Sequence, residues 1–166
     1  MQNNQIPIYS NEDFNYMRKS GSLAAEILDK LKEIIKPGIS TLEINDFCHD
    51  MIITNKAIPA PLNYKGFPKS ICTSVNHVVC HGIPSQNKVL KEGDIINVDV
   101  TVILDGWYGD SSRMFVAGKI NKKIDNLLKT TYECLMLGIE AAKPGKNLGD
   151  IGHVIQNHAE SRNFSV

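Results

Sequence analysis

The sequence lacks the features that mark membrane, secreted and nucleic-acid-binding proteins. Its longest apolar runs, such as residues 134–137, span four of the 166 residues, against the roughly 20 that a membrane-spanning helix needs. Eighteen lysines and arginines balance eighteen aspartates and glutamates, and no run of five basic residues occurs, so no strong field would attract nucleic acid or anionic lipid. Residues 1–10 contain no signal-peptide pattern. We therefore expect a folded cytoplasmic protein with no nucleic-acid or membrane partner.

Simple metal-binding motifs are also missing. The four cysteines form no Cys-x-x-Cys pair, so neither a zinc ribbon nor a redox motif is indicated and reduced thiols are expected. His77 and His81 have the spacing of a zincin pair, but Val78 stands where that motif needs its glutamate base. If this segment is a strand, the two histidines still lie on one face.

Apolar residues at helical spacing predict two helices near the start of the chain. The first runs from about 11 to 36, is capped by Ser10, and ends at Lys36-Pro37-Gly38. The second begins after Ser40, whose hydroxyl can cap the amide of Glu43 while that carboxylate bonds back. It should end before the prolines that follow, since proline disfavours helix in the preceding residue.

A β-hairpin is predicted in the middle of the chain. Residues 95–104 alternate between polar and branched apolar side chains, as in a half-buried strand. Asp105-Gly106 is the dipeptide favoured in a two-residue type I′ turn, and residues 107–116 return as the partner strand. Residues 70–83 are expected to supply further strands.

The end of the chain repeats the beginning. Helical spacing resumes from 124 to 142 and stops at Lys143-Pro144-Gly145, which matches the earlier Lys36-Pro37-Gly38 at an offset of 107 residues. The same offset superposes Ser40 on Asn147 and Glu43 on Asp150. Proline and glycine commonly follow the end of a helix in unrelated proteins, so the match could also arise by chance. We interpret the match as an internal duplication.

The duplication predicts the domain organisation. One unit, residues 11–118, holds two helices followed by a sheet, whereas a second unit, residues 119–166, holds only its two helices. The sheet of the second unit would follow Val166. We therefore expect a single domain, cut within its second half.

Two aspartates of the hairpin are candidate metal ligands. Pairing Leu104 with Trp107 places Asp110 opposite Thr101 and diagonal to Asp99 on the same face, where backbones lie roughly 7–8 Å apart. Carboxylates so placed can converge on one ion or bridge two held roughly 3.5–4 Å apart. The alternative is a solvated pair on the open face of the sheet, although aspartate is disfavoured in mid-strand.

Other candidates lie upstream of the hairpin. His81 precedes Gly82-Ile83-Pro84, a turn from which it could donate to a substrate carbonyl, unless it is an ordinary surface histidine. Tyr64, Phe67 and Cys72 could line an apolar pocket for a flexible side chain such as methionine, or form core under a loop. The histidines interpreted as structural are His49, His153 and His158.

Four segments together carry a family resemblance. They are Asn63–Ser70 (NYKGFPKS), Val79–Pro84 (VCHGIP), Gly93–Thr101 (GDIINVDVT) and Gly109-Asp110. These segments closely resemble type I methionine aminopeptidases of the bacterial form, and the similarity extends from the first helix to Val166. The resemblance implies the α+β pita-bread fold, in which two pseudo-symmetric halves enclose a dinuclear metal site.

The resemblance also implies roles for individual residues. Asp99 and Asp110 match metal ligands, Asp110 being the bridging one, and His81 matches a histidine that contacts the substrate near the scissile bond. Two divalent ions (Mn, Fe, Co or Zn) would polarise the peptide carbonyl and activate a bridging water. The implied substrates are peptides and nascent chains, from which the initiator methionine is removed when the next residue is small. The residues matching the methionine pocket are Tyr64, Phe67 and Cys72.

One departure bears on activity. The family's other metal ligands, one histidine and two glutamates, and a second substrate-binding histidine would follow Val166; His153 falls in the preceding helix. Two aspartates offer at most four oxygens, so we expect this chain to be inactive or nearly so.

The alternatives are a non-catalytic half-fold interaction module, which could self-associate through its exposed half, and a prolidase-like Xaa-Pro peptidase, which should lack the Tyr64–Cys72 pocket.

Overall fold

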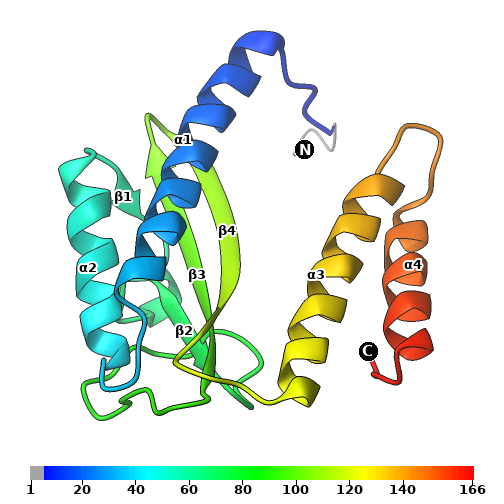
Figure 1. Ribbon diagram of the computed structural model, residues 1–166. Helices are drawn as coiled ribbons and strands as arrows, with labels where there is room; N and C mark the ends of the chain where they lie inside the picture. Colours follow the sequence, from blue (N-terminus) through cyan, green and yellow to red (C-terminus); the bar gives the residue numbers. More distant parts are fainter. Residues whose placement is uncertain (1–5) are drawn as a thin grey trace. The chain divides into compact units, whose positions relative to one another are not determined.

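The computed structural model describes residues 6–166 (Figure 1), which form two compact units, one ending at Lys119 and the other comprising Ile120–Val166. The first unit combines helices with a four-stranded antiparallel sheet, and the second is helical. The elements of the first unit are α1 (Asn11–Lys30), a 3₁₀ turn (Leu31–Glu33), α2 (Thr41–Thr54), β1 (Ile58–Pro59), a 3₁₀ turn (Tyr64–Gly66), β2 (Cys72–Val75), β3 (Ile95–Leu104) and β4 (Trp107–Val116). Those of the second unit are α3 (Lys122–Ala141) and α4 (Leu148–Ser161).

Both predicted N-terminal helices begin where their caps predict. The Ser10 N–H donates to Asp13 at 2.7 Å, and the Ser40 N–H donates to Glu43 at 2.9 Å, each within a capping box. Helix α1 ends at Lys30, short of the predicted 36, and its last turn tightens into the 3₁₀ turn. This tightening is common where terminal carbonyls run out of intrahelical partners.

The hairpin has the predicted register. β3 pairs with β4 along its whole length, with Leu104 opposite Trp107 and Thr101 opposite Asp110. Asp105 and Gly106 both have positive φ, 51° and 84°, as a type I′ turn requires. The other edge of β3 pairs with β2 and β1, so β3 lies inside the sheet.

One face of the sheet forms the core of the first unit. Val98, Val100 and Val102 are fully buried, and α1 packs over β3 and β4. The backbones approach closely there, because a Cβ on Gly109 would lie 2.2 Å from the Ser20 carbonyl. Asp99 lies on the opposite face of β3 and is only partly buried, and within residues 6–119 this face borders the 3₁₀ turn Tyr64–Gly66.

The prediction of strands over 70–83 is only partly correct. β2 stops at Val75, because Asn76 takes a left-handed conformation and its side chain accepts the Ile95 N–H at 3.0 Å. His77 then lies in a turn and His81 in a loop, so the expectation that they share a strand face is wrong. The two-residue β1 was not predicted.

The second unit is a pair of helices, as predicted. His158 on α4 bonds Glu133 on α3 at 2.7 Å, and the Cys134 thiol lies 3.6 Å from the Ile155 carbonyl. His158 is therefore structural, and His153 bonds Asn157 on its own helix at 2.9 Å. No helix within residues 6–166 has the length and apolar character needed to cross a bilayer.

Candidate metal and peptide site

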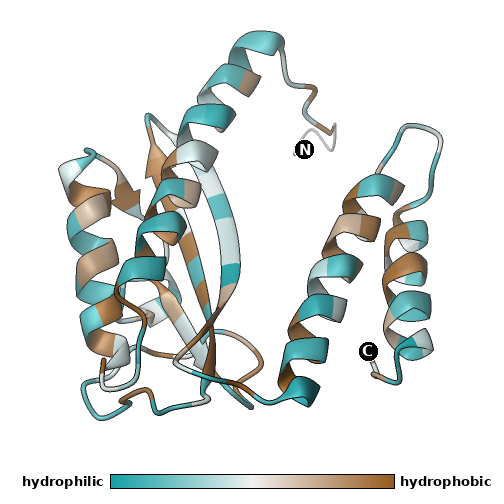
Figure 2. Cartoon of the chain, in the orientation of Figure 1, coloured by the Kyte–Doolittle hydropathy of each residue, from teal (hydrophilic) through white to brown (hydrophobic). Residues whose placement is uncertain are grey.

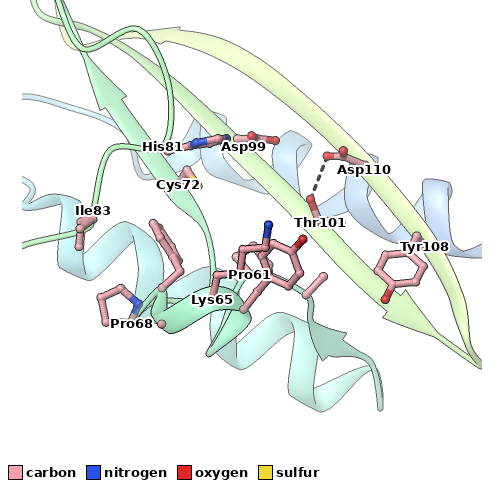
Figure 3. Close-up of a pocket in the computed structure, with 14 residues that line it drawn as sticks. Pro61, Lys65, Pro68, Cys72, His81, Ile83, Asp99, Thr101, Tyr108 and Asp110 are labelled. Carbon is pink, nitrogen blue, oxygen red and sulfur yellow. Dashed lines mark hydrogen bonds between the residues drawn. The ribbon is translucent and has the colours of Figure 1, made fainter.

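A cleft of about 910 Å³ opens in the first unit, on the face of the sheet that carries Asp99. Its walls are the loop around the Tyr64–Gly66 turn, the loop that carries His81, and the β3–β4 hairpin (Figure 3). All six residues singled out from the sequence line it: Tyr64, Phe67, Cys72, His81, Asp99 and Asp110.

The two aspartates project from adjacent strands into this cleft (Figure 3). Asp110 pairs with Thr101, and Asp99 pairs with Ser112 two positions along, so the carboxylates are diagonal neighbours on one face. The Thr101 hydroxyl donates to Asp110 at 2.9 Å and fixes the orientation of that carboxylate. This is the relation that the register predicted.

The surroundings of Asp99 favour a cation. Burial raises the pKa of its carboxyl, the negative charge of Asp110 raises it further, and His81 opposes the shift. Two carboxylates sharing a partly buried site destabilise each other's charged forms, and a positive ion between them would offset this repulsion. Carboxylate oxygens are also suitable donors for divalent ions, so these two residues fit a metal.

His81 is held at the cleft by backbone geometry. Its φ of 54° is left-handed, and the Gly82 carbonyl accepts the Thr73 N–H at 2.8 Å. A Cβ on Gly82 would lie 2.1 Å from the Thr73 carbonyl oxygen, so only glycine permits this approach. The His81 ring consequently lies beside Asp99 (Figure 3), whereas His77 does not line the cleft.

The far end of the cleft is lined mainly by apolar side chains. Pro61, Tyr64, Phe67, Pro68 and Ile83 line it. The carboxylate end and the apolar end meet where Cys72 of β2 pairs with Asp99 of β3. Burial, followed by the charge of Asp99, raises the pKa of the Cys72 thiol to about 11.

Sequence reasoning missed two polar members of the cleft. Tyr108 and Lys65 both line it, and the Lys65 ammonium lies 5.5 Å from the centre of the Tyr64 ring. Tyr108 could have been found, because it stands two residues before Asp110 and therefore on the same face. Lys65 has a left-handed backbone, φ 48°, which no pattern indicated.

The metal donors in the described part of the chain are few. Across residues 6–166, no three His, Cys, Asp or Glu side chains lie close enough together to hold one ion. Asp99 and Asp110 alone would therefore fill only part of a coordination sphere. The remaining donors of a dinuclear centre would have to come from water or from other protein groups.

The sequence was compared with known families and proteins. Residues 15–166 match metallopeptidase family M24. The chain belongs to this family. Since the match covers nearly all of both units, the M24 assignment applies to the cleft and to the α3–α4 pair alike.

The M24 chain is homologous to bacterial methionine aminopeptidases. It is 58% identical to the methionine aminopeptidase of Rickettsia prowazekii over 161 residues, which cover 97% of this chain and 62% of the relative. It is 48% identical to the methionine aminopeptidase of Escherichia coli K12 over 162 residues, 97% of this chain and 61% of the relative. The chain thus spans about 62% of the length of the curated relatives it matches.

Solved structures confirm the predicted α+β pita-bread fold class. The crystal structure of the Rickettsia prowazekii methionine aminopeptidase superposes with a TM-score of 0.95 at 57% identity, covering 98% of this chain and 65% of that chain. The prolidase of Pyrococcus furiosus superposes with a TM-score of 0.78 at 19% identity, covering 93% of this chain and 44% of the prolidase. At that identity the prolidase shows the shared M24 fold alone.

Proposed function

We propose that this chain supplies the metal-binding carboxylate pair and the methionine pocket of an aminopeptidase that removes the initiator methionine when the next residue is small. The convergence of Asp99, Asp110 and His81 in one cleft supports this function, because it joins metal donors to a polar group beside them. The identity to named methionine aminopeptidases supports the same substrate class.

In this proposal Asp99 and Asp110 would hold the divalent ions. A bound divalent ion polarises a carbonyl oxygen and lowers the pKa of a bound water. Thr101 orients Asp110 through its hydrogen bond, and His81 donates to the substrate next to the scissile bond. The ions proposed are Mn, Fe, Co or Zn.

The apolar end of the cleft would take the methionine side chain. Aromatic rings bind thioether sulfur favourably, and Tyr64 and Phe67 place two rings in this wall. Cys72 adds a neutral thiol at neutral pH, since its pKa is about 11. The pocket separates this reaction from that of a prolidase, which binds proline after the scissile bond.

A peptidase assay tests the reaction. Met-Ala-Ser with Mn²⁺ or Co²⁺ is supplied to this chain and to a chimera in which the chain replaces the matching 62% of the Rickettsia prowazekii enzyme. Because two aspartates fill few coordination positions, we expect cleavage by the chimera and little or none by the chain. An inactive chimera that folds would count against the proposed function.

Metal binding can be tested on the chain itself. Asp99→Asn and Asp110→Asn should each weaken Mn²⁺ binding in calorimetry by at least about tenfold, since each removes a charged ligand. Asp105→Asn is the matched control, because it changes an aspartate of the same hairpin while keeping a type I′ turn sequence. Equal binding by all three variants would contradict the assignment of the ligands.

A further inference from the structure

We infer that Asn45 and His49 of α2 are positioning residues for the apolar end of the cleft, and that they act through Ser70. Ser70 lies between Pro68 and Cys72, both of which line the cleft. The inference rests on the proposed function in one respect, because it takes this end of the cleft to be the methionine pocket. Neither residue of α2 lines the cleft itself.

The wall that carries the aromatic rings is poorly anchored by backbone bonds. Residues 63–66 are exposed, and the Asn63 N–H donates to the Phe67 carbonyl at 2.8 Å, so the loop closes on itself. Ladder pairing with β3 begins only at Cys72. The position of Phe67 and Pro68 against the sheet must therefore depend on contacts made by the residues between Phe67 and Cys72.

Ser70 is the anchor in that interval. Its backbone N–H donates to the Asn45 side-chain oxygen at 2.9 Å, and its hydroxyl lies 2.8 Å from Nδ1 of His49. Ser70 and Asn45 are buried, 2% and 5% exposed. The Asn45 amide nitrogen donates to Asp46 at 3.0 Å, which leaves its oxygen directed at Ser70. Two side chains one helical turn apart thus hold one residue of the wall.

The contacts of Asn45 and His49 with Ser70, here called the clamp, hold the segment in one position. A buried N–H without an acceptor is costly, so loss of the Asn45 oxygen would drive the segment to move toward water rather than stay in place. The segment leads directly into Phe67 and Cys72, whereas Asp99 and Asp110 belong to the hairpin. Movement would therefore change the apolar pocket and leave the carboxylate pair in position.

Thiol labelling of the full chain tests the geometry without any peptidase activity. A neutral alkylating reagent is applied and each cysteine is followed by mass spectrometry, with the exposed Cys80 as internal reference. In Asn45→Leu and His49→Leu, we expect Cys72 to label about tenfold faster, equivalent to one lost hydrogen bond. His49→Asn, which keeps a polar atom near Nδ1, should restore slow labelling.

The matched control is His153→Leu, which removes a histidine whose partner is Asn157 on its own helix. It should leave Cys72 labelling unchanged. Ser70→Ala keeps the backbone bond and is the milder variant if Asn45→Leu fails to fold. A lower melting temperature with unchanged Cys72 labelling in His49→Leu and Ser70→Ala would overturn the inference.

Kinetics of the chimera tests the consequence for substrate. In His49→Leu we expect KM for Met-Ala-Ser to rise by about tenfold with kcat nearly unchanged, because binding of the side chain is lost while the reacting groups stay in place. A fall in kcat with unchanged KM would overturn the positioning role. If the unsubstituted chimera is inactive, the proposed function fails, and the labelling result still decides whether the clamp exists.

Discussion

Helices α1 and α2 of the first unit contain 20 and 14 residues, and α3 and α4 of the second contain the same numbers. α2 and α4 are both capped by a residue that follows a Pro-Gly sequence, Ser40 in one and Asn147 in the other. The glycines preceding these caps, Gly38 and Gly145, both have positive φ, 95° and 83°. Local sequence thus produces the same helix ends twice.

The two helix pairs differ in what covers them. α1 packs on β3 and β4 and buries Ile27 completely. In the second unit α3 packs on α4, and Leu135 and Ile139 of α3 remain 53% and 58% exposed. Hydrophobic residues recur along both pairs (Figure 2). Caps therefore decide where a helix begins, while burial depends on whether a sheet lies against its apolar face.

The largest expected effect comes from truncating one isoleucine in each helix pair, buried in the first and exposed in the second. Ile27→Ala should lower the free energy of unfolding by about 2–5 kcal/mol, because it leaves a cavity under the sheet. Ile139→Ala, at an exposed position, should change it by no more than about 0.5 kcal/mol. Urea unfolding followed by circular dichroism measures both. Comparable losses would mean that the apolar face of α3 is covered in solution.

Two glycines sharpen the same contrast. Gly109→Ala should cost about 1–3 kcal/mol, since its Cβ would meet the Ser20 backbone and force β4 away from α1. In Gly138→Ala the new Cβ would lie 3.1 Å from the end of the Ile155 side chain, which can move. Alanine's higher helix propensity, up to about 1 kcal/mol, should make that change neutral or stabilising. The melting temperature should fall in Gly109→Ala and should hold or rise in Gly138→Ala, and a matching loss in both would contradict this.

The caps should behave alike in both units. Glu43→Ala and Asp150→Ala should each cost about 0.3–1 kcal/mol, because each removes a carboxylate that accepts the N–H of the capping residue at 2.9 Å. Hydrogen exchange of the amides of Ser40 and Asn147, which lose their acceptor, would report the fraying of each first turn. If protection is lost at one helix and retained at the other, the same cap sequence does not stabilise the first turn of both helices.

The smallest effect is a pH dependence of the first unit. Hydrogen bonds from the Ser40 backbone and then its hydroxyl hold the pKa of Glu43 below its usual 4.5. Its stabilising contribution is therefore complete above 4.5 and is lost as the pH falls through the lower folded value. The melting temperature of the wild type should thus be higher than that of Glu43→Gln at pH 7. This difference should be smaller at about pH 3. A constant difference between the two proteins would exclude a role for this charge.

The helix starts, hairpin and register could be predicted from the sequence, because each depends on neighbouring residues: a cap, an alternating pattern, a two-residue turn. The loops between β1 and β3 could not, since their paths depend on bonds between distant residues such as Asn45 with Ser70 and Thr73 with Gly82. All six candidate site residues meet in one cleft, while their roles in catalysis stay predictions.

The turn at Asp105-Gly106 has a consequence for chemistry far from the turn. Because side chains alternate between faces, lengthening or shortening this turn by one residue would shift β4 against β3 and turn Asp110 toward the valines of the core. The carboxylate would then lie on the same side as α1, away from Asp99. A connection of two residues thus determines on which side of a protein its acidic groups can meet an ion.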